Sequence, residues 1–440
     1  MDPGAPVEDA SPLIDRLGNI ALIGAGLAWV MVLGRILTHR IYVSHDTVIN
    51  YAHVWYTSES LWHGRGLPVR MPALGHGEAF TFPYGFLPWS VGALLRPVFG
   101  DWTVTLMLVL VTVAVIAATF WAFPELRRGW WAVAVLVEPA IVSSPIIGQL
   151  PFLTGAALLL LGIGAWRRDR RIMAVLAVGL AQATHPAIVL PLAGALVVAW
   201  LPWEPRRRSL VLHYAISLVF ALPALWIVLN APVFEEASVA TKTFGFVGTI
   251  APRSLVILVP IGLVLLQRNW QPQWRGPALC SALVLANVFM WGPLGMPWAW
   301  KGLDRQPDTR MVAFTDSDEF VPGATYRVLR IADGKIGMYQ LLRGGGRLDS
   351  EFFPESIHRR SWATTDAYAR FLQGRQVDFV MIWRGYDRRF ETNEHALLRE
   401  LVVSGGCTDG LRIEHVTSTD EFDLYRVVDC GVQPGAALSV

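Results

Sequence analysis

The sequence predicts a polytopic α-helical membrane protein that ends in a smaller soluble domain. Hydrophobic residues make up 53% of the 440 residues and charged residues 16%, whereas about a quarter of a soluble domain is charged. Apolar runs follow one another from about residue 17 to residue 300, and charged residues become dense after Lys301. This composition excludes a disordered chain, and the net charge of +2 offers no basic surface for a nucleic acid.

Nine apolar runs are predicted to cross the membrane, because ~20 apolar residues span the hydrocarbon core and ~17 are a practical minimum. The first run follows an acidic N-terminus that has no basic segment or small-residue cleavage site, so we expect a retained anchor. Residues 82–99 are not counted, because three prolines and several early aromatic residues fit a helix lying in the interface. Several of the nine runs are shorter than this practical minimum; the runs are residues 18–38, 102–123, 130–144, 150–166, 172–183, 187–201, 209–231, 254–267 and 277–292.

The arginine clusters predict the orientation, because basic residues gather in cytoplasmic loops. With nine spans, every cluster between spans lies in the cytoplasm, the N-terminus is inside and the C-terminal region is outside the plasma membrane. The clusters are Arg127-Arg128, Arg167 to Arg171, Arg206 to Arg208, and Arg268 with Arg275.

Two domains are therefore expected, a membrane domain of residues 1–300 and an extracytoplasmic mixed α/β or α+β domain of residues 301–440. Strand-like segments in the second domain are 325–329, 378–383 and 421–428. Cys407 and Cys430 both lie in this domain, where they either pair in an oxidising compartment or remain two unpaired small residues.

The large first external loop, residues 40–101, is the most informative region for function. Asp46, Asn50 and His53 recur at helical spacing, so they share one face of a helix that leaves the membrane. A carboxylate beside His45 at a boundary of reduced dielectric can act as a general base. The alternative, which spacing alone favours, is that Asp46 caps the helix beginning at Thr47.

Three further polar residues are candidates: Glu138 lies within the third apolar run, and Gln149 and His185 lie at the ends of runs. Glu138 is a functional candidate because ionisable groups at membrane depth are costly, or else it is a hydrogen-bonded carboxyl beside the helix break at Pro139. Gln149 and His185 fall at external ends of spans, on the same side as Asp46. This convergence from distant positions favours a site at the external boundary.

No spaced set of His, Cys or Asp residues in the sequence predicts a defined metal site. His45, Asp46 and Glu59 are the least implausible ligands, and a divalent cation stays an open possibility. Glu235-Glu236, with Lys242 and Arg253 in the second sizeable external loop, is better explained as a solvated charge run than as a phosphate or cation site.

Short motifs in and after the first external loop form a recognisable set. They are Ser44–Asp46, Leu61-Trp62-His63-Gly64, Leu67-Pro68-Val69-Arg70 and the aromatic 82–88 segment in the loop, followed by Ile147-Gly148-Gln149 and Gly179–Pro186. This set resembles GT-C-type glycosyltransferases, polytopic membrane enzymes that use a polyprenyl-phosphate sugar donor. The resemblance covers roughly residues 18–200, and many members carry two adjacent acidic residues where this chain has His45-Asp46.

The resemblance implies that Asp46 is the base that deprotonates the acceptor hydroxyl, with His45 beside it. Arg70, His45 or His53 would stabilise the departing phosphate. We expect Glu59, Glu138, Gln149 and His185 to help bind substrate.

The predicted function is sugar transfer from a polyprenyl-phosphate donor to a glycan or glycolipid acceptor of the cell envelope, in contact with the lipid bilayer. The alternative is a non-enzymatic polytopic protein, either a transporter or an envelope assembly factor with an external binding domain. Transporters commonly contain inverted repeats, and none is visible in the sequence. The third alternative is an inactive relative of these enzymes that uses its external domain only to bind partners.

Overall fold

The computed structural model describes residues 12–42, 44, 47–68, 71–75, 86–229, 239–269, 275–291, 314–329, 336–349, 362–383, 393–420 and 422–431. Two compact units divide the chain. Unit 1 comprises Met1–Leu67, Thr81–Asn230 and Thr243–Gln306. Unit 2 comprises Pro68–Phe80, Ala231–Lys242 and Pro307–Val440, so it includes a stretch of each of the two sizeable predicted external loops as well as the C-terminal region.

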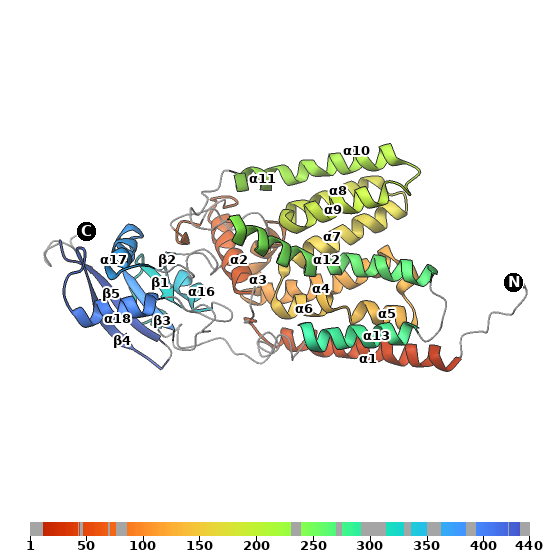
Figure 1. Cartoon of the computed structure of the whole chain (residues 1–440). Coiled ribbons are helices and arrows are strands. Elements are labelled where there is room, and N and C mark those ends of the chain that lie inside the picture. Colours follow the sequence, from red (N-terminus) through yellow and green to blue (C-terminus); the bar gives the residue numbers. More distant parts are fainter. Residues whose placement is uncertain are drawn as a thin grey trace, which may run out of the picture. The chain divides into compact units, whose positions relative to one another are not determined.

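Most of the chain before residue 292 is helical, and α4, α7 and α8 lie side by side (Figure 1). Short 3₁₀ turns η2 (Pro124–Leu126) and η3 (Val219–Ala221) join some of these helices, and a π-helical turn, η4 (Asn287–Trp291), follows the last. The helices are α1 (Pro12–Leu37), α2 (Thr47–Trp62), α3 (Phe86–Phe99), α4 (Trp102–Ala122), α5 (Gly129–Leu136), α6 (Pro139–Ile147), α7 (Leu150–Arg167), α8 (Arg171–Thr184), α9 (Pro186–Trp200), α10 (Arg207–Leu218), α11 (Leu222–Leu229), α12 (Val239–Asn269) and α13 (Arg275–Ala286).

Within the described residues, five stretches are long and apolar enough to cross a membrane. Three shorter apolar helices, Arg171–Thr184, Pro186–Trp200 and Arg275–Phe289, coincide with further predicted runs. The polytopic helical class is thereby supported, while the number of nine crossings stays a prediction. The five long stretches are Leu13–Leu37, Trp102–Ala122, Gly129–Ile147, Leu150–Arg167 and Arg207–Trp226.

The stretch Gly129–Ile147 is broken between α5 and α6, and side chains satisfy the backbone groups that the break exposes. The Glu138 carboxylate accepts hydrogen bonds from the amides of Ala140 (3.0 Å) and Ile141 (2.6 Å). Trp29 Nε1 donates to the Leu136 carbonyl at 2.9 Å, and Asn287 Nδ2 donates to the carbonyl of the next residue. Unpaired backbone groups are costly in an apolar medium, so these contacts allow the break to exist there.

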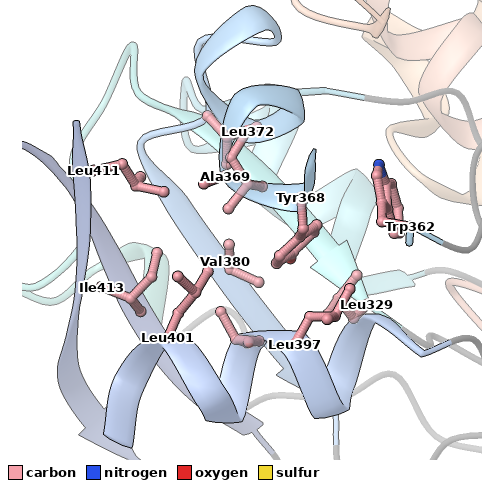
Figure 2. Close-up of a cluster of buried hydrophobic side chains, with 12 residues drawn as sticks. Leu329, Trp362, Tyr368, Ala369, Leu372, Val380, Leu397, Leu401, Leu411 and Ile413 are labelled. Atoms are coloured by element: carbon pink, nitrogen blue, oxygen red, sulfur yellow. The ribbon is translucent and has the colours of Figure 1, made fainter. Parts of the chain in front are cut away.

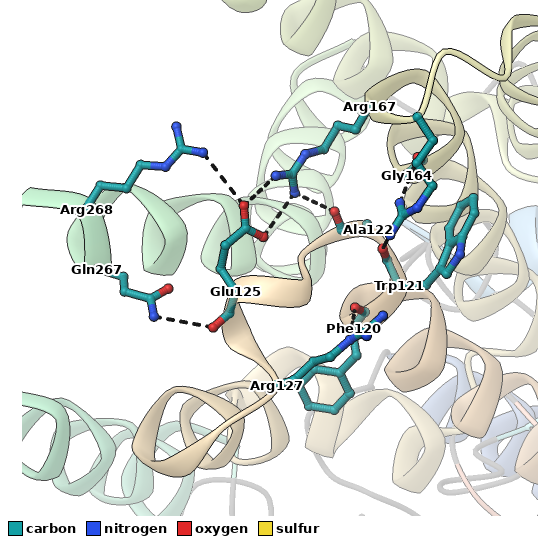
Figure 3. A network of polar contacts seen from close by, with 10 residues as sticks. Phe120, Trp121, Ala122, Glu125, Arg127, Gly164, Arg167, Gln267 and Arg268 are labelled. Carbon is teal, nitrogen blue, oxygen red and sulfur yellow. Dashed lines mark hydrogen bonds and ion pairs between the residues drawn. The ribbon is translucent and has the colours of Figure 1, made fainter.

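The arginine-rich turns of unit 1 meet at one end of the helices. In Figure 3 the Glu125 carboxylate, in η2 between α4 and α5, accepts from Arg167 Nη2 at 2.5 Å, and Arg268 lies 3.7 Å away. Burial alone would raise the pKa of Glu125, but the hydrogen bond and the charges of these arginines hold it below its usual value. Asp169 likewise joins the α7–α8 turn to Arg206 at 2.5 Å. The turns therefore share one end, as the charge pattern predicted; the side of the membrane stays a prediction.

Unit 2 contains a five-stranded mixed sheet in the order β2-β1-β3-β5-β4. The strands β2, β1 and β3 are parallel, β5 is antiparallel to β3, and β4 is antiparallel to β5. The predicted strands 325–329, 378–383 and 421–428 correspond to β1, β3 and β5. The elements are β1 (Thr325–Leu329), α16 (Ile336–Arg343), β2 (Arg347–Leu348), α17 (Thr365–Gly374), β3 (Phe379–Trp383), α18 (Glu394–Ser404), β4 (Leu411–Ser418) and β5 (Phe422–Asp429).

The core of unit 2 lies between the sheet and helices α17 and α18. Figure 2 shows Tyr368 and Leu372 of α17 and Leu401 of α18 directed towards Val380 of β3. A disulfide joins Cys407 to Cys430, so of the two readings of these cysteines the paired one is correct.

A segment of the first loop adds to the exposed edge of this sheet. Leu74 forms a parallel bridge with Leu348 of β2, whose amide donates to the Ala73 carbonyl at 2.7 Å. Met71 and Leu74 are buried there. Because β2 is only two residues long, this pairing covers an edge that would otherwise be open to other strands.

Candidate functional site

The two predicted catalytic residues, Asp46 and His45, lie outside the described residues, and so does Arg70. Residues on both sides of the first pair are described, however. Ser44 precedes them, and Thr47 begins helix α2 directly after them. The geometry of the site is therefore built from these neighbours and from what they contact.

Ser44 is bound to the end of α6, far away in sequence. Its hydroxyl donates to the Ile146 carbonyl at 2.5 Å, and the hydroxyl of Tyr42 donates to the same carbonyl at 2.7 Å. The Ser44 amide also donates to Thr47 Oγ1 at 2.8 Å, and that hydroxyl donates back to the Ser44 carbonyl at 2.9 Å. The chain is thus held on each side of residues 45 and 46.

Gly148, in the turn between α6 and α7, allows this close approach. Its φ of +84° is a left-handed conformation that favours glycine. A Cβ atom at this position would lie 2.1 Å from Thr47 Cγ2 and 2.9 Å from the Thr47 amide nitrogen. Any larger residue would therefore push the start of α2 away from the turn.

Asn50 completes the contact between α2 and the same turn. Its Nδ2 donates to the Gly148 carbonyl at 3.0 Å, and its Oδ1 accepts from Trp89 Nε1 of α3 at 2.9 Å. The ring of His53 stacks on Trp89, with ring centroids 3.9 Å apart. Asn50 and His53 thus share one face of α2, as their spacing predicted.

His53 is fully buried, and its Nδ1 lies 2.6 Å from the Ile49 carbonyl. Burial lowers the pKa of His53 to about 3. Burial therefore favours the uncharged form of the ring, while the role of His53 at the departing phosphate stays a prediction.

Gln149 lies beside the positively charged side chain of Arg253. When the Gln149 amide is oriented with its oxygen towards the guanidinium, which pairs both ends of the amide, Nε2 donates to Ser144 Oγ at 3.2 Å, and Oε1 accepts from Arg253 Nε at 3.1 Å and from Arg253 Nη2 at 2.9 Å. Arg253 belongs to α12, so the amide links the N-terminal end of α7 to a helix about 100 residues later. Gln149 follows Gly148 directly, which places this guanidinium beside the turn that holds Thr47 and Asn50.

His185 lies between α8 and α9 and packs against the first turns of α7. Its ring meets Phe152 edge-on at 6.1 Å, and its Cβ lies 3.4 Å from where a Cβ of Gly155 would be. The predicted convergence of Gln149 and His185 on one end of the helices is therefore present in the structure.

Two other predicted site residues lie elsewhere and have structural partners. Glu59 is paired with Arg96 of α3 at 3.1 Å, about three turns along α2 from Thr47. Glu138 caps α6 at the end opposite to Ile146. The hydrogen-bonded alternative for Glu138 accounts for its position, and neither residue contacts the Ser44–Asn50 segment through a described interaction.

Polar contacts also close the base of the first loop. Arg40 and Asp101, at its two ends, lie 3.6 Å apart. The Tyr42 amide donates to the Tyr51 hydroxyl at 2.9 Å, and this hydroxyl bonds Thr105 of α4 at 2.7 Å. Burial raises the pKa of Tyr51 above its usual value, so it remains protonated and able to donate. The start of α2 is therefore held against α4 as well as against the α6–α7 turn.

Arg253 was not among the residues predicted to form the site, because the sequence pattern grouped it with the solvated charge run that contains Glu235-Glu236. Its position in the sequence was the available indication: it directly precedes the run 254–267, whereas the arginine clusters of the predicted cytoplasmic turns lie at the opposite ends of the runs. Among the described residues, no group of three or more His, Cys, Asp or Glu side chains is arranged to hold a metal ion.

No family model and no curated protein matches this sequence. The structure is similar to that of the archaeal oligosaccharyltransferase AglB from Archaeoglobus fulgidus in complex with an inhibitory peptide and a dolichol-phosphate. The two share 12% identity, over 85% of this chain and 70% of that chain, with a TM-score of 0.48. It is also similar to ArnT from Cupriavidus metallidurans in the apo state, at 13% identity over 94% of this chain and 98% of that chain, with a TM-score of 0.45. For ArnT from Cupriavidus metallidurans bound to undecaprenyl phosphate, the identity is 15% over 92% of this chain and 97% of that chain, with a TM-score of 0.45. The likeness concerns the fold alone, and the contacts described above belong to this chain.

Proposed function

We propose that this protein is an integral-membrane glycosyltransferase that moves a sugar from a polyprenyl-phosphate donor to a cell-envelope acceptor on the extracytoplasmic face. One observation supports the proposal: Ser44 and Thr47, which flank the His45-Asp46 pair in sequence, contact the junction of α6 and α7, and Gln149 at this junction lies beside Arg253 of α12. The proposed reaction uses the Asp46 carboxylate and the Arg253 guanidinium together. Dolichol-phosphate and undecaprenyl phosphate, named in two of the similar structures, are lipids of the proposed donor class.

In the proposed reaction, an acceptor hydroxyl attacks the anomeric carbon of the sugar. The bond from this carbon to the phosphate oxygen breaks, and polyprenyl phosphate leaves with the electron pair. Asp46 takes the proton of the hydroxyl as general base, which typically contributes ~10²–10⁴-fold to the rate. Arg253 stabilises the charge that develops on the leaving phosphate, while Gln149 orients the guanidinium through two hydrogen bonds.

The remaining predicted site residues are proposed to bind substrate or to support the fold of the site. His45 and His185 bind the sugar or the acceptor by hydrogen bonds, and Arg70 contributes a second positive charge. His53 acts as a neutral packing residue that supports α2, as its burial and its stacking on Trp89 indicate.

The decisive experiment measures transfer from radiolabelled polyprenyl-phosphate sugars in membranes. Asp46→Asn should reduce transfer by at least about 100-fold while the protein remains inserted. Glu59→Gln is the matched control, because Glu59 is paired with Arg96 and should be dispensable. Full activity of Asp46→Asn would refute the general-base role. A wild-type protein inactive with every donor would favour the transporter or assembly-factor alternative.

The membrane orientation has its own test. A periplasm-active reporter fused after Val440 should be active if the C-terminal region is extracytoplasmic. An inactive reporter in a correctly inserted fusion would refute the proposed side of the reaction.

A further inference from the structure

An apolar cavity of about 170 Å³ lies between helices of unit 1 near their arginine-rich end. Residues of α7, α8, α9, α10 and α12 line it. The lining includes the small side chains of Ala174 and Ala193. Gly162 is also part of the lining, and it allows close packing, because a Cβ there would lie 2.5 Å from Val178 Cγ2. The last residue of α7, Arg167, lies about 27 Å along the helix from its N-terminal end. The cavity is therefore separate from the candidate active site.

The walls of the cavity suit hydrocarbon. Leu159 and Ala193 are buried at its inner part. The polar groups in its lining already have protein partners: His213 Nδ1 lies 2.6 Å from the Ser209 carbonyl, and Trp166 Nε1 donates to Glu204 at 3.0 Å. An apolar cavity of ~150 Å³ is large enough to hold a benzene-sized molecule and stays dry when empty. This cavity can therefore accept several methylene groups of an acyl chain.

The mouth of the cavity combines exposed apolar groups with a positive charge. Trp200 is 48% exposed and Leu265 is 53% exposed, and the Arg268 side chain is 65% exposed beside them. Residues 123–129, 167–171, 201–208 and 268 carry ten arginines and three carboxylates, a net charge of +7. Glu125, Asp169 and Glu204 therefore leave most of this charge available to an anionic head group.

We propose that this cavity binds an anionic phospholipid of the surrounding bilayer, with part of one acyl chain inside it and the phosphate near Arg268. The bound lipid fills the space between α7, α9 and α12 and holds these helices together. This inference is independent of the glycosyltransferase proposal, because it concerns the opposite end of the helices and a lipid that is not consumed.

Native mass spectrometry of the full-length protein in detergent tests the proposal directly. After delipidation, palmitoyl-oleoyl phosphatidylglycerol should bind at a concentration about tenfold lower than phosphatidylcholine with the same chains. Ala193→Phe, which fills the cavity, should weaken phosphatidylglycerol binding at least tenfold. Ala195→Phe adds the same side chain at an exposed position of α9 outside the lining and should leave binding unchanged.

A second pair of variants tests the head group. Arg268→Gln should weaken binding of phosphatidylglycerol but not of phosphatidylcholine, whereas Arg208→Gln, an equal change of charge outside the lining, should have little effect. If Ala193→Phe does not fold, Leu196→Trp at the rim replaces it. Equal affinity for the two lipids, or equal losses in the paired variants, would overturn the proposal. So would displacement of phosphatidylglycerol by lower concentrations of undecaprenyl phosphate, because the site would then belong to the donor lipid.

Discussion

Asn50 and Gly148, separated by 98 residues in sequence, are joined by a 3.0 Å hydrogen bond from the side-chain amide to the backbone carbonyl. The same amide accepts from Trp89, so one side chain connects α2 to both α3 and the α6–α7 turn. This relationship holds the start of α2 against the turn that precedes Gln149.

Asn50→Ala should destabilise this junction. The substitution leaves the Gly148 carbonyl and the Trp89 indole N–H without these partners in a buried position, which costs about 1–3 kcal/mol for each group. We expect a lower melting temperature in detergent and a lower transfer rate. Trp89→Phe keeps an aromatic ring beside His53 and should lose only part of the stability. Fully additive effects of the two substitutions would contradict the shared hydrogen bonds.

Gly148→Ala should lower the free energy of unfolding more than Gly64→Ala, although both glycines have a positive φ. Gly64 has a φ of +72° and no neighbouring atom within 4 Å of the place that a Cβ would occupy, so Gly64→Ala measures the left-handed strain alone, about 1–2 kcal/mol. At Gly148 the contact with Thr47 adds to this strain. Melting temperatures of the two variants check the difference. Thr47→Ser, which removes Cγ2, should partly rescue Gly148→Ala; no rescue would argue against the contact.

The burial of His53 predicts a loss of stability in acid. The unfolded chain takes up a proton near pH 6.5, whereas the pKa of about 3 keeps the folded ring neutral. The free energy of unfolding should therefore fall by up to about 1.4 kcal/mol for each pH unit as the pH decreases from 6.5 towards 3. Denaturation between pH 7.5 and 4.5 measures this slope, and His53→Phe should flatten it. The exposed His63→Phe is the matched control; an identical slope in the wild type and in His53→Phe would refute the assignment.

In unit 2, the buried Arg327 predicts an asymmetry between two substitutions. Arg327 donates to both carboxylate oxygens of Glu394 and, at 2.5 Å, to Asp349. Burial alone would lower the pKa of Arg327, but these two carboxylates raise it well above its usual value. Arg327→Gln leaves two buried carboxylates without their cation and should cost about 3–5 kcal/mol. Asp349→Asn keeps the Glu394 pair and should cost clearly less. Chemical denaturation of the full chain compares them, and equal losses would contradict this account.

Much of the helical arrangement followed from local sequence pattern. The nine apolar runs coincide with helices over their described parts, and three strand segments of unit 2 were predicted. The strands β2 and β4 were not, because a strand of two residues has no readable alternation and β4 mixes exposed charged residues with few buried ones. Glu138 and Glu59 looked functional because they are acidic, yet each has a local structural partner that composition does not reveal.

The sequence by itself determined the membrane class, the positions of the apolar helices and the gathering of arginines at one end, because these depend on composition and short-range periodicity. Only the tertiary structure decided which polar groups meet. Ser44 contacts Ile146, Gln149 contacts Arg253 and Leu74 pairs with Leu348. Such contacts join residues about 100 or more positions apart, so they depend on how helices and strands pack, and no local pattern encodes that packing.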